Sequence, residues 1–291
     1  NGNISSNNIN GLTTTGAAAV NGISVSGITG GSNGFSILKN KIYNLTANNA
    51  GGSVNGIVVS YGGTIVAAVV TIFNNLIGDL KAPLTSNNFA INGILVDAGA
   101  ASTASNIYFN TIYIAATSTN TNFGTAGIRH TSNATATTNT LNLRNNLIYN
   151  NSTPNGTGKT HVLYRSSSSL SNYAATSNNN LFYAGIASTN NLIYSDGTNN
   201  EQTLTDFQTR VTGRESLSKT GIVTFLSFDG VNGNFLVPNF TVDATSSILN
   251  GQAAAIATFT DDIIGSVRQT NPDIGAYESI CNVTQLAVSP N

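Results

Sequence analysis

The chain has 291 residues, of which only 8% are charged, and its formal net charge is −1. A globular domain ordinarily carries about 25% charged residues. A net charge this close to zero gives no reason to expect nucleic acid or an anionic membrane surface as a partner. No apolar run approaches the roughly 18 residues of a spanning helix, which predicts that the chain does not insert into a membrane.

Branched apolar and aromatic residues are plentiful, which distinguishes the chain from a disordered segment. Its surface must then consist mainly of Asn, Ser, Thr and Gly, and such a surface favours a secreted or cell-surface location. The chain has no Met and begins at Asn1, so we interpret it as a processed or excised segment. Its single cysteine, Cys281, permits neither an internal disulfide nor a cysteine-based metal site, and either pairs with a downstream segment or is an inert thiol.

Two short phrases alternate along the chain from its start to residue 185. In the first phrase an apolar column is spaced by 34, 37, 34 and 34 residues, at Ile23, Ile57, Ile94, Ile128 and Val162. A glycine column precedes it at Gly22, Gly56, Gly93 and Gly127, with His161 in the fifth repeat. These glycines are expected to supply a positive φ or a close approach between coils.

The second phrase recurs at 37–45, 72–80, 107–114, 143–151 and 177–185, with a weaker copy at 4–12 that contains Asn7. Its central asparagines are spaced by 35, 35, 36 and 34 residues, at Asn40, Asn75, Asn110, Asn146 and Asn180. Two phrases with one period indicate a repeat array. Alternating apolar residues bounded by Gly and Asn predict short strands, so we expect an all-β parallel β-helix of about six coils over residues 1–195.

In such a fold an inward asparagine satisfies backbone groups at a turn and bonds to the asparagines above and below it as a ladder. The alternative is that Asn is present only as a turn former. After the repeats, residues 203–213 predict one short helix, with Leu204, Phe207 and Val211 on one face and Gly213 at its end. Residues 196–279 as a whole predict a strand-rich closing segment, and 280–291 a linker to a further module.

Charged residues gather near the end of this closing segment, at Arg268, Asp273 and Glu278. We expect them to form a paired, partly buried network that closes the last coil, because the ends of solenoids need covering. A catalytic pair of carboxylates is the alternative.

The phrases NGIxV and IxNNxI resemble the repeats of right-handed parallel β-helix proteins of the pectate-lyase-like superfamily, over roughly residues 1–195. NPDIGAYE at 271–278 is similar to the closing phrase of secreted β-helix proteins from Bacteroidetes. The resemblance implies a right-handed solenoid, further domains of the same polypeptide and a sorting domain of the type IX secretion route. Enzymes of this superfamily use clustered Asp residues that bind calcium together with an Arg or Lys base.

The early coils contain too few acidic residues for such a calcium cluster, because only Asp79 and Asp97 precede residue 129. No cofactor is therefore predicted. Calcium remains a weak alternative on the Asp, Asn and Gly content of 195–201 and 229–234, which turn chemistry also explains.

One constellation has residue types suited to catalysis: Asp97, Arg129, His130 and Arg165. Counted from the apolar column, Asp97, Arg129 and Arg165 face outward and His130 inward, with Asp97 and Arg129 about 7–8 Å apart as diagonal neighbours. The group is either a lyase or sugar-binding site, or a weak surface ion pair beside a packed histidine.

The sequence as a whole favours a non-enzymatic structural or adhesive module of a large secreted or cell-surface bacterial protein. Its partner would be a polysaccharide or cell-surface glycan, since an uncharged surface suits neutral sugars and tolerates salt. Whether the chain is an enzyme stays open. The alternatives are a polysaccharide lyase or glycoside hydrolase acting near Asp97, Arg129 and Arg165, and ice binding, against which the lack of a uniform Thr column counts.

Overall fold

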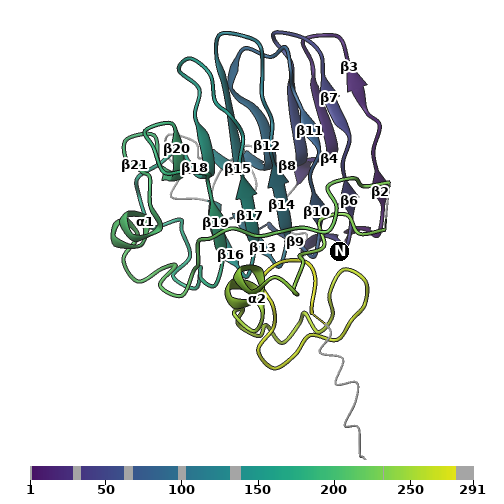
Figure 1. Ribbon diagram of the computed structural model, residues 1–291, viewed down its shortest axis with the longest axis vertical. Coiled ribbons are helices and arrows are strands. Elements are labelled where there is room, and N and C mark those ends of the chain that lie inside the picture. The colour runs from purple at the N-terminus through teal and green to yellow at the C-terminus, as the bar shows by residue number, and fades with distance from the viewer. Residues whose placement is uncertain are drawn as a thin grey trace, which may run out of the picture.

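The computed structural model describes residues 2–28, 34–61, 68–97, 103–131, 139–231 and 233–279. Over these residues the chain winds into a right-handed parallel β-helix, whose coils stack from the N-terminal strands toward helix α1 (Leu204–Arg210), as Figure 1 shows. Cys281 and the predicted linker 280–291 lie outside the described residues.

Strands at equivalent places in successive coils form four sheets. The five-stranded sheet contains β1 (Gly2–Ser5), β5 (Phe35–Leu38), β9 (Val69–Phe73), β13 (Thr103–Tyr108) and β16 (Asn139–Arg144). The six-stranded sheet contains β2 (Asn8–Ile9), β6 (Lys41–Ile42), β10 (Leu76–Ile77), β14 (Thr111–Ile114), β17 (Leu147–Asn150) and β19 (Leu181–Tyr183). The three-stranded sheet contains β3 (Thr13–Thr14), β7 (Leu45–Ala47) and β11 (Leu80–Lys81). The seven-stranded sheet contains β4 (Ala19–Ile28), β8 (Ser53–Tyr61), β12 (Asn87–Asp97), β15 (Phe123–Thr131), β18 (Thr160–Arg165), β20 (Asn191–Ser195) and β21 (Asn200–Glu201).

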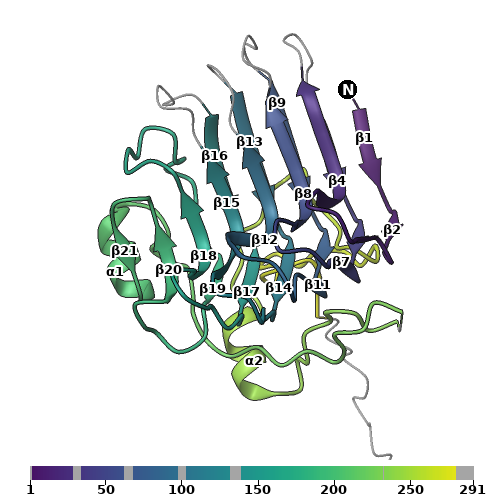
Figure 2. The same ribbon diagram turned by 90° about the horizontal axis from the view of Figure 1, so that it is seen from above.

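The solenoid has five complete coils, one for each strand of the five-stranded sheet that Figure 2 shows from above, and not the six predicted. The last repeat, at 177–185, forms only part of a coil. It contributes β19 and is followed by β20, but the stretch that leads into β19 joins the preceding coil only through isolated bridges, Leu141 to Tyr173 and Arg144 to Asn178. A sixth strand is therefore missing from the five-stranded sheet.

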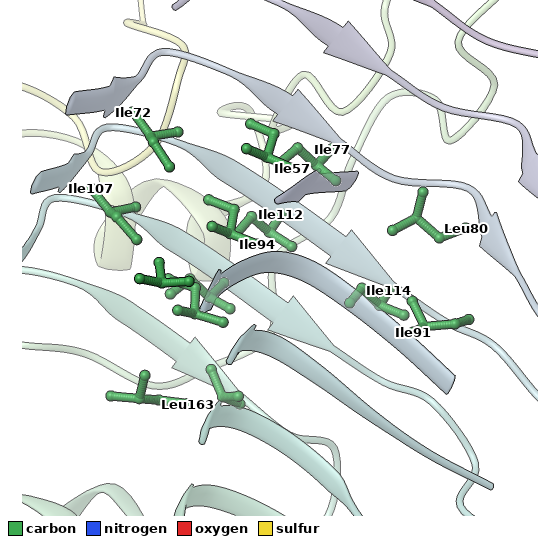
Figure 3. Close-up of a cluster of buried hydrophobic side chains, with 14 of the residues drawn as sticks. Ile57, Ile72, Ile77, Leu80, Ile91, Ile94, Ile107, Ile112, Ile114 and Leu163 are labelled. Carbon is green, nitrogen blue, oxygen red and sulfur yellow. The ribbon is translucent and has the colours of Figure 1, made fainter. Parts of the chain in front are cut away.

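Columns of apolar side chains fill the interior because strands of successive coils pair in register. Ile57 lies opposite Ile94, and Ile77 lies opposite Ile112. These side chains are fully buried, and Figure 3 shows them stacked between the strands. Each such burial stabilises the fold by about 1.5–3 kcal/mol.

The glycine column marks a close approach between coils. A Cβ at Gly56 would lie 2.5 Å from the carbonyl oxygen of Gly93 and 2.5 Å from Cγ2 of Ile77. The four glycines Gly22, Gly56, Gly93 and Gly127 do not have a positive φ. Of the two roles expected for them, close approach is therefore the one that the geometry supports.

The asparagine column forms a continuous hydrogen-bonded ladder along the solenoid. The Nδ2 group of each asparagine donates to Oδ1 of the asparagine one coil later, at 2.9–3.0 Å, through Asn7, Asn40, Asn75, Asn110, Asn146 and Asn180. Each Oδ1 also accepts the main-chain N–H of the earlier asparagine at 2.9–3.0 Å. The ladder thus satisfies backbone groups that the turn leaves unpaired.

The turn itself is made by the residue before each ladder asparagine. All six of these residues have φ from 53° to 62° in the left-handed region: Ser6, Lys39, Asn74, Phe109, Asn145 and Asn179. Only short polar side chains such as Asn adopt this conformation readily, and three of the six are Asn. Five of their side chains contact the last part of the chain: those of Lys39, Asn74, Phe109, Asn145 and Asn179.

That last part, residues 221–279 and here called the C-terminal segment, corrects the prediction of a strand-rich closing segment. It contains a second short helix, α2 (Asp243–Leu249), and isolated bridges such as Phe225 to Pro238. Its apolar patches pack side chains against the solenoid and do not pair as strands. The helix predicted over 203–213 is confirmed as α1, with Phe207 and Val211 fully buried.

The C-terminal segment covers the outer face of the six-stranded sheet, across which it runs in Figure 1. That face carries a row of tyrosines, in which Tyr113 and Tyr149 stack at 5.5 Å and Tyr149 and Tyr183 at 4.2 Å. Gly78 takes one position in the row, and a Cβ there would lie 3.0 Å from Leu236. A second apolar core therefore lies outside the solenoid, between the sheet and this segment.

Arg268 anchors the C-terminal segment to the side of the solenoid. Its guanidinium pairs with Glu278 at 3.1 Å, donates to Asn74 Oδ1 at 2.8 Å and lies 3.8 Å from the ring centre of Phe109. The Asp273 carboxylate accepts the main-chain N–H of Gly251 at 2.7 Å and forms no ion pair with Arg268, whose Nη1 instead donates to the Asp273 main-chain carbonyl oxygen at 3.5 Å. The three predicted residues thus lie together, but against the third and fourth coils and not across the last one, because the segment folds back along the solenoid.

Candidate functional site

The candidate site is the outer face of the seven-stranded sheet around Arg129, where the repeat first departs from Ser, Val and Leu. Arg129 on β15 lies between Leu95 on β12 and Tyr164 on β18. Its guanidinium carbon lies 3.9 Å above the ring centre of Phe89, and that ring lies 4.6 Å from the ring of Tyr164. The result is a half-buried cluster of two aromatic rings and one cation.

The guanidinium of Arg129 has unused hydrogen-bonding capacity. It makes no ion pair or hydrogen bond with any described residue, and its Nε is buried without a partner. Burial lowers the pKa of Arg129, while the neighbouring Tyr164 and Asp97 raise it. A guanidinium nevertheless stays protonated in proteins, so Arg129 offers a cation with free donors.

Asp97 lies on the same face but does not pair with Arg129 among the described residues. It is exposed, and because it lies opposite Thr131 its Oδ1 accepts a hydrogen bond from the Thr131 hydroxyl at 2.8 Å. The carboxylate is thus two positions along the strand from Leu95, the residue opposite Arg129. The predicted surface ion pair is not formed here.

His130 lies inside the solenoid, as its inward parity predicted. Its Nε2 is 3.1 Å from Oδ1 of Asn139, and its Nδ1 has no partner among the described residues. Burial, together with the charge of Arg165, lowers the pKa of His130 to about 3. The ring is therefore neutral at ordinary pH, and it is only 1% exposed, so it has no access to a substrate on the outer face.

Arg165 also lies inside, which corrects its predicted outward position. Leu163, and not Val162, continues the column of Ile128, so Arg165 falls opposite the inward His130. Its guanidinium donates to the carbonyl oxygen of Ser169 at 2.8 Å and to the amide oxygen of Asn172, and it is fully buried. A shift of one residue in register moves a side chain to the opposite face of the strand.

The same shift removes the exception in the glycine column. Val162 follows Gly127 there, and its carbonyl oxygen would lie 2.7 Å from a Cβ at Gly127. His161 instead pairs in register with Ala126, and Ala126 pairs in register with Asn92 of the coil before it. Burial lowers the pKa of His161 to about 4. Its ring stacks on Phe89 at 5.5 Å, so His161 also contacts the Arg129 cluster.

The four candidate residues are therefore divided between the two sides of one sheet. Asp97 and Arg129 are on the outer side, whereas His130 and Arg165 are enclosed. Acid–base catalysis needs its groups within hydrogen-bond reach of one substrate atom, and this arrangement does not bring them to one place.

Sequence reasoning missed Glu215, which ends the asparagine ladder. Glu215 Oε2 accepts Nδ2 of Asn180 at 2.9 Å and the hydroxyl of Ser218, and Oε1 accepts the hydroxyl of Tyr173. Burial raises the pKa of Glu215, while the hydrogen bonds from Ser218, Tyr173 and Asn180 lower it. The signal was present in the spacing, because Glu215 follows Asn180 by 35 residues, the ladder's own period.

A second aromatic surface lies at the edge of the C-terminal segment. A cavity of about 240 Å³ is lined by Tyr113, Phe228, Leu80 and Ala115, with Asp79 and Lys81 at its polar side. Asp79 and Lys81 pair with each other at 2.8 Å. Their charges are thus already matched, in contrast to that of Arg129.

The described ranges contain no group of three His, Cys, Asp or Glu side chains placed to hold a metal ion. Asp196, in the calcium-like stretch 195–201, accepts the main-chain N–H groups of Thr198 and Asn199 at 3.0 and 2.7 Å, as in a turn. Neither helix there has the length and apolar character to span a membrane.

Comparison with protein families, with curated proteins and with solved structures finds no match to this chain. The fold described above, a right-handed parallel β-helix, therefore rests on the strand pairing of the chain itself.

Proposed function

We propose that the chain is a non-enzymatic structural and adhesive module of a large secreted or cell-surface protein, which holds a glycan against the outer face of the seven-stranded sheet. The observation that carries this proposal is the Arg129 cluster. It combines half-buried aromatic rings, Phe89 and Tyr164, with a guanidinium whose donors are unused.

These groups match the chemistry of a sugar. The C–H face of a pyranose packs on aromatic rings, and its hydroxyl oxygens accept hydrogen bonds from a guanidinium. The exposed carboxylate of Asp97 lies on the same face and accepts hydrogen bonds from hydroxyl groups. The charges of Arg129 and Asp97 are confined to one part of this face, so most of the contact with a glycan would be uncharged and tolerant of salt.

Binding to polysaccharides tests the proposal. The purified chain is run by affinity electrophoresis through gels containing mannan, xylan or mixed-linkage glucan, with polygalacturonate as the acidic member. We expect retardation by at least one neutral polymer. Arg129→Ala should weaken that binding by about 10- to 100-fold, because hydrogen bonds to a charged group contribute about 1.5–3 kcal/mol.

The matched control is Arg144→Ala, which removes a half-buried arginine from the five-stranded sheet. It should leave the retardation unchanged, and so should a change at the 240 Å³ cavity, Phe228→Ala. Equal loss in all three variants would count against a site at Arg129.

The enzymatic alternative, a polysaccharide lyase or glycoside hydrolase, is favoured by no observation at the site, since His130 and Arg165 are enclosed. It makes a clear prediction nonetheless. Release of unsaturated or reducing sugars from polygalacturonate by the purified chain, lost in Arg129→Ala, would replace the adhesive proposal with an enzymatic one.

We also propose that the chain is related to the pectate-lyase-like superfamily and to its secreted Bacteroidetes type. The β-helix fold and the phrase NPDIGAYE support this assignment. The full-length gene provides the test, because a sorting domain of the type IX route downstream would agree with it. A gene that encodes a single cytosolic domain would contradict both the secreted location and the adhesive role.

A further inference from the structure

The two ends of the solenoid are finished differently. At the C-terminal end, Phe207 of α1 stacks on Tyr194 at 4.6 Å and lies 5.6 Å from the ring of Phe182. Glu215 and Ser218 receive the last donors of the asparagine ladder, from Nδ2 and the main-chain N–H of Asn180. Strand β21 pairs with β20 in the antiparallel sense. The interior, the ladder and part of the edge are thus covered at this end.

The N-terminal end has no such cover within the described residues. Strands β1, β2, β3 and β4 each pair with a neighbour on one side only, β5, β6, β7 and β8 respectively. Their apolar side chains are also less buried than those one coil later. Ile4, Ile9 and Val25 are half-buried, whereas their register partners are fully buried: Ile37, Ile42 and Val59.

Asn7 shows which chemical group is missing. In every later step of the ladder, Oδ1 accepts both Nδ2–H and the main-chain N–H of the asparagine one coil earlier. Asn7 is exposed, and its Oδ1 accepts no hydrogen bond from any described residue. The ladder therefore begins with an open acceptor placed to receive two N–H groups from one asparagine.

We infer that the N-terminal edge is a docking surface for one further parallel β-coil, which presents an asparagine in the ladder register and apolar residues over Ile4 and Ile9. Open main-chain groups on edge strands bind another strand, and at this end β1, β2, β3 and β4 all pair in the parallel sense. The apolar ends of a solenoid interior need cover, which the same coil supplies.

A second copy of this chain does not meet these requirements. Its C-terminal end is covered by α1 and Glu215, so it has no parallel edge to offer. Its N-terminal edge would approach in the antiparallel sense, which does not place an asparagine one coil before Asn7. The occupant is thus a polypeptide coil of the same repeat type.

The test is to supply such a coil to the full chain. A copy of residues 35–69 is fused directly before Gly2, in place of Asn1. This places the copied Asn40 35 residues before Asn7, the separation between Asn40 and Asn75. We expect one unfolding transition with its midpoint raised by about 3 °C or more. Amide hydrogen exchange in β1 and β2 should slow as well.

Two controls keep the test specific. The same fusion with Asn40→Ala in the copied coil only should lose most of the gain. An unchanged midpoint together with rapid exchange throughout the added coil would overturn the inference, and an equal gain in the control would overturn the role of the ladder. Sedimentation of the unextended chain tests whether a second copy of the chain occupies the N-terminal edge. A dimer that the fusion abolishes would assign the edge to a second copy and overturn the proposal.

Discussion

The solenoid and the C-terminal segment are held by different kinds of interaction. The solenoid repeats one set of main-chain hydrogen bonds and one ladder contact in every coil, so each coil is supported by its neighbours. The C-terminal segment has few repeated contacts and depends on individual side chains, such as Arg268, that reach residues nearly two hundred positions away. Loss of one contact in the solenoid should therefore destabilise neighbouring coils together, whereas loss of one contact in the C-terminal segment should release that segment.

Arg268→Met should produce the largest effect, and it should fall on the C-terminal segment. The change leaves the carboxylate of Glu278 buried without its partner, which costs about 3–5 kcal/mol. Limited proteolysis should then cleave within 221–279 while the circular dichroism of the strands persists. Arg210→Met, at an exposed arginine that pairs with Glu201, is the control and should have little effect.

Asn110→Ala should come next, and it should destabilise the whole solenoid in one transition. It removes the acceptor for the main-chain N–H and Nδ2 of Asn75, both of which are buried. The free energy of unfolding should fall by about 2–4 kcal/mol, as measured by urea denaturation. Asn190→Ala, at an exposed asparagine, should change it by less than about 0.5 kcal/mol. A separate early transition in Asn110→Ala would contradict cooperative unfolding of the coils.

Acid should weaken the solenoid through its buried histidines. The pKa of His161 is about 4 in the folded state and about 6.5 when unfolded, so the unfolded chain binds the additional proton. Stability from this group is present above pH 6.5 and is lost as pH falls toward 4, by about 2 kcal/mol at pH 5.

A pH series of urea denaturations on wild type and His161→Gln measures this loss, because the difference between the two isolates the histidine. Glu215 and Glu278 act in the opposite direction, since burial raises the pKa of both carboxyl groups. They are present in both proteins and cancel in the comparison. Parallel pH curves for the two proteins would show that His161 does not carry the effect.

Lys39→Ala should have the smallest effect. Lys39 Nζ lies 2.6 Å from Asp261, but the Asp261 side chain is 44% exposed and solvent screens the pair. The free energy of unfolding should change by less than about 1 kcal/mol, and the proteolysis rate of the C-terminal segment should change little. A loss as large as that of Arg268→Met would mean that surface pairs and not the buried anchor hold the segment.

The features that the sequence predicted best are those that repeat. One period located the asparagine column and the strands, because each coil poses the same packing problem as the last. The register of the fifth coil was wrong by one residue, since short apolar phrases such as HVLYR align equally well at Val162 and Leu163. That slip alone placed Arg165 on the wrong side of the sheet.

The C-terminal segment and the Arg129 cluster could not be predicted from the repeat period, for a physical reason. Their contacts join residues without a shared period, such as Phe89 with Tyr164 and Asn145 with Ala254. Nothing in the local pattern of 221–279 distinguishes a strand in a coil from a chain packed over tyrosines. Of the two helices in the described residues, only α1 at Leu204–Arg210, whose signals are local, was predicted; α2, within 221–279, was not.

The asparagine ladder also has an electrical direction. Every side-chain carbonyl points toward the N-terminal coil and every amide N–H toward the C-terminal one, so the amide dipoles add along the solenoid as peptide dipoles do along a helix. The positive end of this row is at Asn180, where the carboxylate of Glu215 accepts the last N–H. An acidic residue is therefore favoured at that end and a donor at the other. The side chains that finish the two ends are thus determined by the polarity of the row as well as by the space available.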